Sequence, residues 1–192
     1  VTRFNVSKKR FGKIQIPLLH VSKQQEIVSH LDTFTTLISN LESELDMRRK
    51  QYEHYRNQLL DFEGVEVVEW KTLGEVAINR DRMRKPITAS KRVAGIYPYY
   101  GASGIVDYVE GYIFDGNYLL ISEDGANLIA RSTPIAFPIS GKTWVNNHAH
   151  VLKPKVGTNV DYLCYAWMFY DVSGLVNGAT RQKLTQADMR KK

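Results

Sequence analysis

Residues 21–63 decide the fold of this chain, and they read VSKQQEIVSHLDTFTTLISNLESELDMRRKQYEHYRNQLLDFE. Ser22 followed by Gln25 matches the capping-box pattern that begins many helices. From there no glycine or proline interrupts the chain until Gly64. The stretch therefore predicts one continuous helix of about 40 residues, roughly 60 Å long.

Apolar residues recur along this helix with the 4-3 spacing of a coiled-coil seam, over about five heptads. They form two alternating sets, Ile27, Phe34, Leu41, Tyr55 and Phe62 in one and Leu31, Ile38, Leu45, Tyr52 and Leu59 in the other. Arg48 is the charged residue in the seam. A long amphipathic helix lying on its own domain is the alternative, but such helices rarely exceed about 25 residues. We expect pairing with a second helix, from another chain or from the same protein outside this sequence, because an unpaired seam favours aggregation.

Beyond Gly64 the pattern changes to short strands and turns. Strands are predicted at residues 65–73, 96–100, 105–108, 112–114, 118–122, 134–138 and 145–153, and a helix at residues 162–170. Asp115-Gly116 predicts a two-residue hairpin turn. The fold class is therefore α+β, a globular domain plus a long coiled-coil helix, with boundaries at residues 1–20, 21–63 and 64–192.

Positive charge is concentrated in three segments of a chain whose formal net charge is +6. Residues 3–13, 71–92 and 181–192 are rich in Lys and Arg, whereas residues 107–124 carry Asp and Glu without any Lys or Arg. This distribution favours a polyanionic partner on one side of the molecule and repels phosphate on another.

The sequence also predicts the compartment. Cys164 is the single cysteine, which excludes an internal disulfide framework, and no apolar run approaches the roughly 20 residues that cross a bilayer. No signal peptide is recognisable either, so we expect a cytoplasmic protein without membrane contact. The first residue is not Met and the chain stops in a basic run, which suggests a fragment.

A short internal similarity suggests a two-fold repeat. Residues 1–7, VTRFNVS, align with residues 179–185, ATRQKLT, and Phe11 then falls opposite Met189. Residues 1–20 are accordingly interpreted as a junction that follows a preceding repeat.

Several stretches together resemble the DNA-specificity (S) subunits of type I restriction-modification systems. Ile14-Gln15-Ile16-Pro17 followed by Gln24-Gln25-Glu26-Ile27-Val28 is similar to the family's junction between a strand and its spacer helix, although residues 18–22 lack the usual proline-rich turn. The stretch VEWKTLGEV at residues 68–76 resembles the opening of a target-recognition domain. YPYYGASG at residues 97–104, ISEDGA at 121–126 and VNNHAHV at 145–151 resemble its internal signatures.

This resemblance implies a fragment with one target-recognition domain and one spacer helix. Such subunits read the two halves of a split site in double-stranded DNA, with two antiparallel helices fixing the gap. Methyltransferase (M) subunits and an ATP-driven restriction (R) subunit assemble on them. The resemblance implies no cofactor on this chain, with S-adenosylmethionine, ATP and Mg on the partner subunits.

Catalytic motifs are not recognisable in the sequence, neither an adenine-methyltransferase motif nor a phosphate-binding glycine-rich loop. Asp61 with Glu69-Trp70-Lys71 offers paired acids and a lysine, but an ordinary helix end and strand start explain them better. His148 and His150 lie on one side of a predicted strand without a third metal ligand nearby, which favours a structural pair. We expect no catalytic residue and no metal site.

The DNA-binding hypothesis assigns two roles, because cations at phosphates supply affinity and polar groups in a groove supply selectivity. The candidates for phosphate contact are Arg80, Arg82, Arg84, Lys85, Lys91, Arg92, Lys142 and Arg181. The candidates for base edges are Ser103, Asn146, Asn147 and Gln182. For Asn146 and Asn147 a plain turn is the alternative. The competing function is a non-catalytic coiled-coil adaptor that binds protein.

Overall fold

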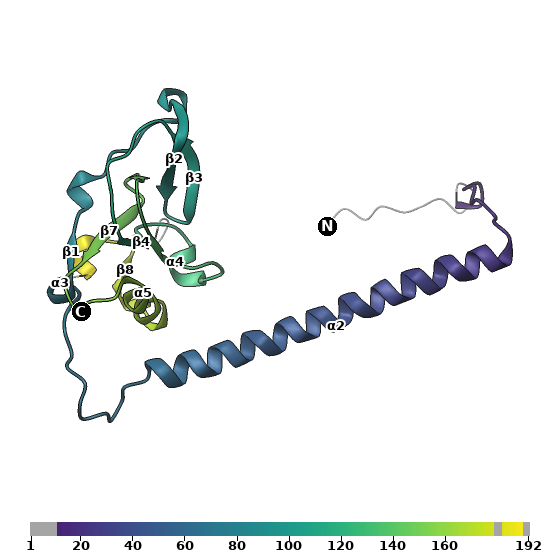
Figure 1. Cartoon of the computed structure of the whole chain (residues 1–192), viewed down its shortest axis with the longest axis horizontal. Helices are drawn as coiled ribbons and strands as arrows, with labels where there is room; N and C mark the ends of the chain where they lie inside the picture. The colour runs from purple at the N-terminus through teal and green to yellow at the C-terminus, as the bar shows by residue number, and fades with distance from the viewer. Residues whose placement is uncertain (1–10, 179–181, 190–192) are drawn as a thin grey trace. The chain divides into compact units, whose positions relative to one another are not determined.

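The computed structural model describes residues 11–178 and 182–189 (Figure 1). The chain divides into two compact units, Val1–Tyr55 and Arg56–Lys192. Helix α2 spans Val21–Leu60, 40 residues without an interruption, so the predicted long helix is confirmed. Among the described residues no helix combines the length and the apolar character needed to cross a membrane.

Helix α2 begins one residue earlier than the predicted cap at Ser22. The backbone N–H groups of Lys23 and Gln24 both donate to the carbonyl of His20, so Ser22 already lies in the first turn and the predicted capping box is wrong. His20 is therefore the residue that precedes the helix and accepts its first backbone hydrogen bonds, and its Nδ1 lies 2.8 Å from Ser22 Oγ.

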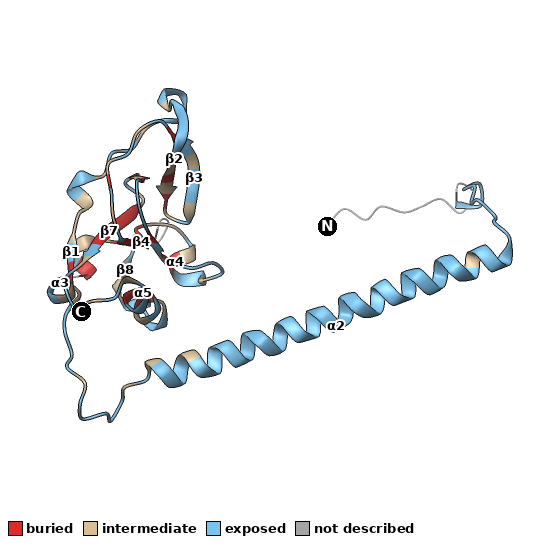
Figure 2. Cartoon of the chain, in the orientation of Figure 1, coloured by how far each residue is buried: buried red, intermediate tan, exposed pale blue. Residues whose placement is uncertain are grey.

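The apolar seam of α2 is open to solvent throughout. No residue of the helix is buried, and Figure 2 shows α2 almost entirely in the colour of exposed residues. Leu31, Phe34 and Ile38 each keep more than half of their surface exposed, at 59%, 60% and 56%. The helix therefore carries a long apolar stripe that this unit alone does not cover.

The second unit, Arg56–Lys192, is called the globular unit below. Its described elements are α3 (Leu73–Val76), β1 (Ala77–Asn79), η1 (Asp81–Met83), η2 (Ala89–Lys91), β2 (Ala94–Gly101), β3 (Gly104–Val109), β4 (Tyr118–Ser122), α4 (Asn127–Ala130), β5 (Ala136–Ile139), β6 (Trp144–Val145), β7 (Ala149–Pro154), α5 (Val160–Phe169), η3 (Ser173–Leu175), β8 (Val176–Asn177), β9 (Lys183–Leu184) and α6 (Gln186–Met189).

The described strands form three sheets. The main sheet has the order β1-β7-β4-β5, and all of its pairs are antiparallel. The second sheet has the order β3-β2-β6, with β6 parallel to β2, and β8 pairs with β9 antiparallel.

Strand β4 lies at the centre of the core, and all five of its residues are buried. Leu119 and Ile121 pack with α5, while Leu120 faces the second cluster, which contains Phe114 and Val151. Apolar groups therefore cover both faces of the strand, which is why residues 118–122 read as a continuous apolar run rather than an alternating one. The mixed α+β class is confirmed.

Helix α5 covers one face of the main sheet. It begins at Val160 because the Asn159 side chain caps it, accepting the backbone N–H groups of Asp161 and Tyr162. The predicted helix at residues 162–170 missed this cap and began two residues late. Leu163, Cys164 and Trp167 supply its buried face.

Three strand predictions are wrong. No strand occupies residues 65–73; instead Glu75 accepts hydrogen bonds from the Thr72 N–H and hydroxyl at the start of α3. Residues 112–114 contribute only a single bridge, from Phe114 to Thr143, and Gly116 donates to Gly141, so Asp115-Gly116 does not join two paired strands. The predicted strand 145–153 is split into β6 and β7 by a turn.

Candidate nucleic-acid interface

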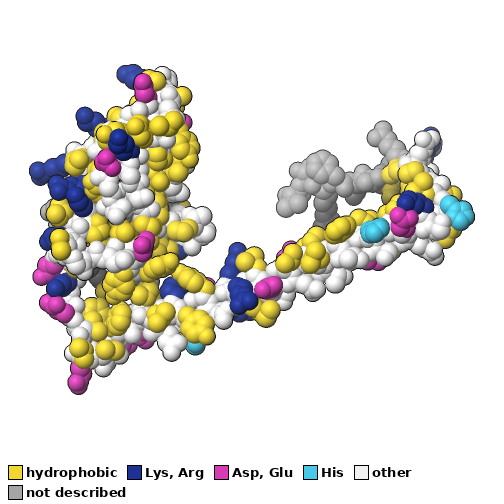
Figure 3. Space-filling model, viewed as in Figure 1, with side chains coloured by type: hydrophobic (Ala, Val, Ile, Leu, Met, Phe, Trp, Pro, Cys, Tyr) yellow, Lys and Arg dark blue, Asp and Glu magenta, His cyan; other side chains and the backbone are white. Residues whose placement is uncertain are grey.

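A basic segment links β1 to β2 across residues 80–93, and Figure 3 shows Lys and Arg side chains gathered at the outer edge of the globular unit. Its backbone is fixed to the sheets: Arg80 N–H donates to Val151 O at 2.7 Å and Lys85 N–H donates to Val145 O at 3.3 Å. Trp144 Nε1 also donates to Lys85 O, at 2.6 Å. The side chains of Arg82, Lys85 and Lys91 remain exposed and Arg80 is half-buried, so these four stay candidates for phosphate contact.

Arg84 points inward instead. Its Nη1 donates to Glu123 Oε2 at 2.6 Å and to the Ala149 carbonyl at 2.7 Å, and its Nε donates to the Asp81 carbonyl at 3.1 Å. Only 13% of the side chain is exposed. Its donors are committed to internal acceptors, so Arg84 has a structural role and we remove it from the phosphate set.

Arg92 is also largely committed within the domain. Its Nη1 forms an ion pair with Asp107 Oδ2 at 3.0 Å, its Nε donates to Ile87 O, and the guanidinium lies 4.6 Å from the centroid of the buried Tyr99 ring. The hydrogen bond from Arg92 lowers the pKa of Asp107. Arg92 therefore anchors the basic segment to the β3-β2-β6 sheet. A DNA phosphate would have to compete with the Asp107 carboxylate for the Arg92 guanidinium.

His150 lies at the centre of a buried polar network beneath this segment. Its Nδ1 lies 2.6 Å from Asp81 Oδ2 and its Nε2 lies 2.8 Å from the Leu184 carbonyl, and the side chain is 1% exposed. Both ring nitrogens therefore have a polar partner, and the ring links Asp81 of the basic segment to the Leu184 carbonyl on β9. His150 has this structural position, whereas His148 lies elsewhere, with its Nδ1 at 2.9 Å from Asp124 Oδ2 and 41% of its side chain exposed.

Two carboxyl groups in the network have pKa values below their ordinary range. Burial raises the pKa of Asp81, but the hydrogen bond and charge of His150, with donors from Asn79 and the Val151 backbone, outweigh it and lower the pKa. Burial likewise acts to raise the pKa of Glu123, and Arg84, Lys183 and His150 together lower it. Both groups are therefore carboxylates at neutral pH.

The polar candidates fall on segments that are bonded to one another. Ser122 Oγ donates to Ala102 O, Glu123 N–H to His148 O, and Gly125 N–H to Gln182 O. These bonds join the turn after β2, the turn before β7, the loop after β4 and the residue before β9. We call this edge the polar rim; Ser103 and Asn147 on it are exposed, and His148 and Gln182 are half-buried.

Asn146 does not belong to the accessible set. It is 8% exposed and its Oδ1 accepts the His148 backbone N–H at 2.8 Å, which forms the turn that separates β6 from β7. The turn alternative therefore holds for Asn146, while Asn147 next to it remains exposed. Gln182 is half-buried, and its Oε1 is itself buried without a hydrogen-bond partner among the described residues, so this predicted base contact is not available through the amide oxygen.

Aromatic groups beside the basic segment were missed in the sequence. Lys142 Nζ lies 4.7 Å from the centroid of the Tyr112 ring, which stacks edge-on with Tyr97 at 5.1 Å. Half-buried Trp144 on β6 is tied to Lys85. The frequent Tyr and Trp at residues 97–112 and 144 could have indicated an aromatic surface, but only the pairing of β2, β3 and β6 brings these residues together.

Arg181, which was also predicted to contact phosphate, lies outside the described residues.

The described residues contain no group of three or more His, Cys, Asp or Glu side chains placed to hold a metal ion. Asp61 and Glu69, the nuclease-like pair considered from sequence, are both exposed, and Lys71 Nζ pairs with Glu69 at 3.0 Å. The side chains exposed on this surface are cations, amides and hydroxyls, the groups that bond phosphates and base edges in nucleic-acid complexes.

A family model described as the type I restriction modification DNA specificity domain matches residues 63–192. A relative from Haemophilus influenzae, classed among type I restriction enzyme specificity subunits, is 42% identical over 128 residues, covering 67% of this chain and 32% of its own length. The EcoprrI specificity subunit of Escherichia coli is 35% identical over 162 residues, covering 79% of this chain and 37% of that protein. This chain thus spans about a third of the length of these relatives.

A solved structure has a similar fold. The crystal structure of a type I restriction-modification S subunit from M. genitalium aligns with a TM-score of 0.55 at 18% identity, covering 88% of this chain and 52% of that one. At this level of identity the match concerns the fold alone, a long helix joined to a mixed α and β unit.

Proposed function

This chain belongs to the family of type I restriction-modification DNA specificity domains, and from that premise we propose that its globular unit recognises one part of a DNA target without catalysing a reaction. The observation that carries the proposal is the position of the polar rim. The turn of the rim that contains Asn147 and His148 connects β6 to β7, and the backbone of the basic segment is hydrogen-bonded to these same two strands, at Trp144, Val145 and Val151.

The two sets of side chains suit the two tasks of a DNA-reading surface. Arg82, Lys85 and Lys91 would contact phosphates, which supplies affinity that does not depend on sequence. Ser103 and Asn147 would face base edges, where an amide bonds adenine on two atoms and a hydroxyl accepts or donates. His148 extends this set, since 41% of its side chain is exposed.

The buried network would hold the basic segment in its binding conformation in the absence of DNA. Arg84, Asp81 and His150 tie the basic segment to β7 and to the Leu184 carbonyl on β9 through charged hydrogen bonds. Charge-assisted bonds are short and directional, so a segment held by them loses little conformational entropy on binding.

The remaining assignments concern the whole protein. We propose that α2 pairs with a second helix as a spacer, and that methyltransferase and restriction subunits assemble on this scaffold. S-adenosylmethionine, ATP and Mg would be bound by those subunits. The affinity for random duplex DNA at low salt distinguishes DNA recognition from the competing adaptor function, because an adaptor would show little of it.

Binding of a random duplex over a range of salt concentrations tests the proposal. Each phosphate contact contributes a slope of about 0.9 to the fall of log affinity with log salt, so an Arg82→Gln/Lys85→Gln/Lys91→Gln variant should lose about two to three units of slope and bind at least tenfold more weakly. A Lys23→Gln/Arg49→Gln/Lys50→Gln variant on α2 removes the same charge and is the control. Equal losses in both variants, or absence of binding by the wild type, would refute the proposal.

A further inference from the structure

Ser122 is a buried polar residue at the end of an otherwise apolar strand. It is the last residue of β4, it is 3% exposed, and residues 118–121 before it are all buried in the core. Its hydroxyl donates to the carbonyl of Ala102, which belongs to the other sheet. A side chain of the main sheet is therefore bonded to the turn that joins β2 to β3, at the end of these strands that lies beside β4 (Figure 1).

The turn between β2 and β3 has little to fix its conformation within its own sequence. It consists of two residues, Ala102 and Ser103, between the paired glycines Gly101 and Gly104. Gly104 has a φ of +121°, in the region that glycine occupies most readily, and glycines leave the backbone more conformational freedom than other residues. The pairing of the two strands is also irregular just before the turn, where its register shifts. A hydrogen bond from outside the hairpin is therefore well placed to set the position of this turn.

The neighbouring turn, between β6 and β7, has anchors of its own. Asn146 N–H donates to Tyr100 O at 3.0 Å, and Glu123 N–H donates to His148 O at 2.9 Å. The side chain of Asn146 also accepts the His148 N–H, at 2.8 Å. Asn147 thus lies between two anchored residues, and none of these bonds involves the hydroxyl of Ser122.

The two exposed residues of the polar rim have the same local arrangement. Ser103 directly follows Ala102, which is bonded to Ser122, and Asn147 directly follows Asn146, which is bonded to Tyr100. A hydrogen bond to a base edge tolerates only a few tenths of an ångström in length, so a side chain on a loose turn discriminates poorly between bases. Each exposed residue therefore depends on the anchor beside it for any selectivity that it has.

We propose that Ser122 is a positioning residue that sets the base preference of Ser103 without touching DNA itself. Its hydroxyl would hold the turn between β2 and β3 in the one position from which Ser103 bonds a base edge. Without that hydroxyl the turn is free to move, while the separately anchored Asn147 keeps its position. This inference rests on the proposed function, because it assumes that the polar rim faces the bases.

Selection of sequences from a randomised duplex pool by the full chain, at low salt, tests this role. Ser103→Ala and Asn147→Ala first identify the base pairs whose preference depends on each side chain. Ser122→Ala is then compared with Thr143→Val, which removes another buried hydroxyl, one without a hydrogen-bond partner among the described residues. The quantity measured is the ratio of affinities for the preferred base and the others at each position. Partial unfolding does not change this ratio, because it lowers binding to every sequence equally.

Ser103→Ala should reduce the preference at its base pairs by about tenfold, and Ser122→Ala should reduce it at the same base pairs by at least roughly threefold. The preference at the base pairs that depend on Asn147 should stay within about twofold in Ser122→Ala, and Thr143→Val should change neither set. A role of Ser122 confined to packing would instead change both sets of base pairs together or neither of them. Circular dichroism establishes that each variant is folded. If Ser122→Ala is not, Ser122→Cys takes its place, because a thiol is a weak donor of similar size, and should reduce the preference at the base pairs of Ser103.

The outcomes separate this inference from the function on which it rests. A wild type that enriches no sequence would overturn both the proposed function and the role of Ser122. A wild type with a clear preference that Ser122→Ala retains in full would overturn the role of Ser122 alone. The same holds if Ser103→Ala changes no base pair, or if Ser122→Ala weakens the base pairs of Asn147 as much as those of Ser103.

Discussion

At the scale of single residues, identical side chains in one basic segment have different roles. Arg82 and Arg84 are two positions apart, yet Arg82 is exposed whereas the Arg84 guanidinium donates to Glu123 and Ala149. The difference follows from the turn η1, Asp81–Met83. This turn directs the Arg82 side chain outward and the Arg84 side chain toward β7. A charge count over residues 80–92 therefore overestimates the cations that are available to a phosphate.

Stability should depend on pH through Asp81 and Glu123. Their ordinary pKa values are 3.8 and 4.5, and both are lowered in the folded chain. The unfolded chain therefore binds protons more readily, so the stabilisation is complete above about pH 5 and is lost as the pH falls through the folded pKa values. Urea unfolding at pH 7, 5 and 3.5 should show little change between the first two and a marked loss at the third.

The matched variants are Glu123→Gln and Glu110→Gln, since Glu110 is exposed. Glu123→Gln removes the closer of the two carboxylates that pair with the buried Arg84 guanidinium and leaves Asp81 Oδ2 at 3.6 Å, which should lower the free energy of unfolding at pH 7 by roughly 3 kcal/mol. It should also make the acid-induced loss smaller, because one of the two responsible carboxyls is gone. If Glu110→Gln had the same effect, or if Glu123→Gln left the pH dependence unchanged, the buried network would not be the cause of the pH-dependent stability.

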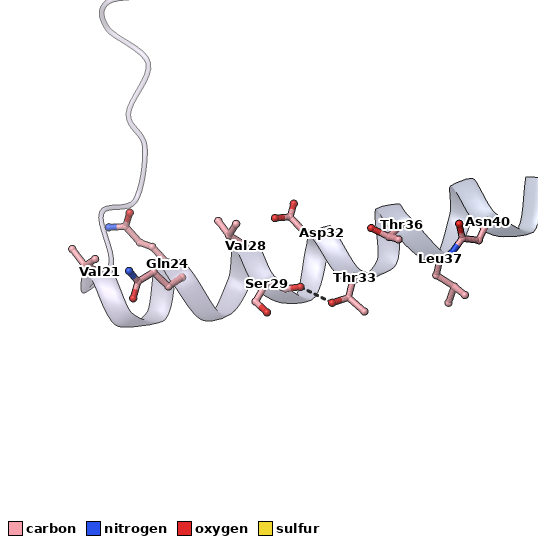
Figure 4. A pocket seen from close by; sticks show the side chains of 10 residues that line it. Val21, Gln24, Val28, Ser29, Asp32, Thr33, Thr36, Leu37 and Asn40 are labelled. Atoms are coloured by element: carbon pink, nitrogen blue, oxygen red, sulfur yellow. Dashed lines mark hydrogen bonds between the residues drawn. The ribbon is translucent and has the colours of Figure 1, made fainter.

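At the scale of elements, α2 has two unlike faces. At 100° per residue, the seam through Leu31, Ile38 and Leu45 lies opposite a groove that runs along the first half of the helix (Figure 4). That second face is mostly polar, and Thr33 Oγ1 donates there to the Ser29 carbonyl at 2.8 Å. Association through α2 should therefore use the seam and spare the polar face.

Sedimentation velocity of the isolated chain tests this pairing. The wild type should sediment as a dimer, and Leu31→Lys/Ile38→Lys/Leu45→Lys should convert it to a monomer because lysines in the seam would bring like charges into an apolar contact. The control places the same three lysines on the polar face, as Ser29→Lys/Thr36→Lys/Asn40→Lys, and should remain dimeric. We expect antiparallel pairing. A monomeric wild type, or a control that dissociates as fully as the seam variant, would contradict the prediction.

At the scale of the whole molecule, a paired α2 would act as a ruler between two recognition domains. Deleting one heptad, residues 42–48, from each helix keeps the seam in register and shortens the spacer by about 10 Å. Duplex DNA rises roughly 3.4 Å per base pair, so the preferred gap between half-sites should fall by about three base pairs. The half-sites also rotate by about 100° around the duplex, which should weaken binding.

Selection of preferred sites from a randomised DNA pool, in a reconstituted complex, measures this shift. The half-site sequences should stay the same while the gap narrows, because the deletion leaves both recognition surfaces intact. Deletion of residues 42–45 alone, which breaks the heptad register, is the control and should impair assembly. An unchanged gap after the heptad deletion would mean that another part of the complex sets the spacing.

The sequence by itself determined the elements whose hydrogen bonds or burial are local. The length of α2 follows from an uninterrupted 4-3 pattern, since every backbone bond of a helix is made within a few residues. Strand β4 was likewise readable at residues 118–122 because a strand buried on both faces is apolar throughout. The change after Gly64 from a helical pattern to short strands and turns then indicated the α+β fold class.

Tertiary structure alone decided which candidate side chains are available. Arg84 was removed from the phosphate set by partners 39 and 65 residues away, and Asn146 was removed by the turn that its own side chain forms once β6 pairs with β2. The polar rim exists only because four separated segments are hydrogen-bonded to one another. A side chain's type is local, but its exposure and its partners depend on contacts distant in sequence, and these a single sequence does not specify.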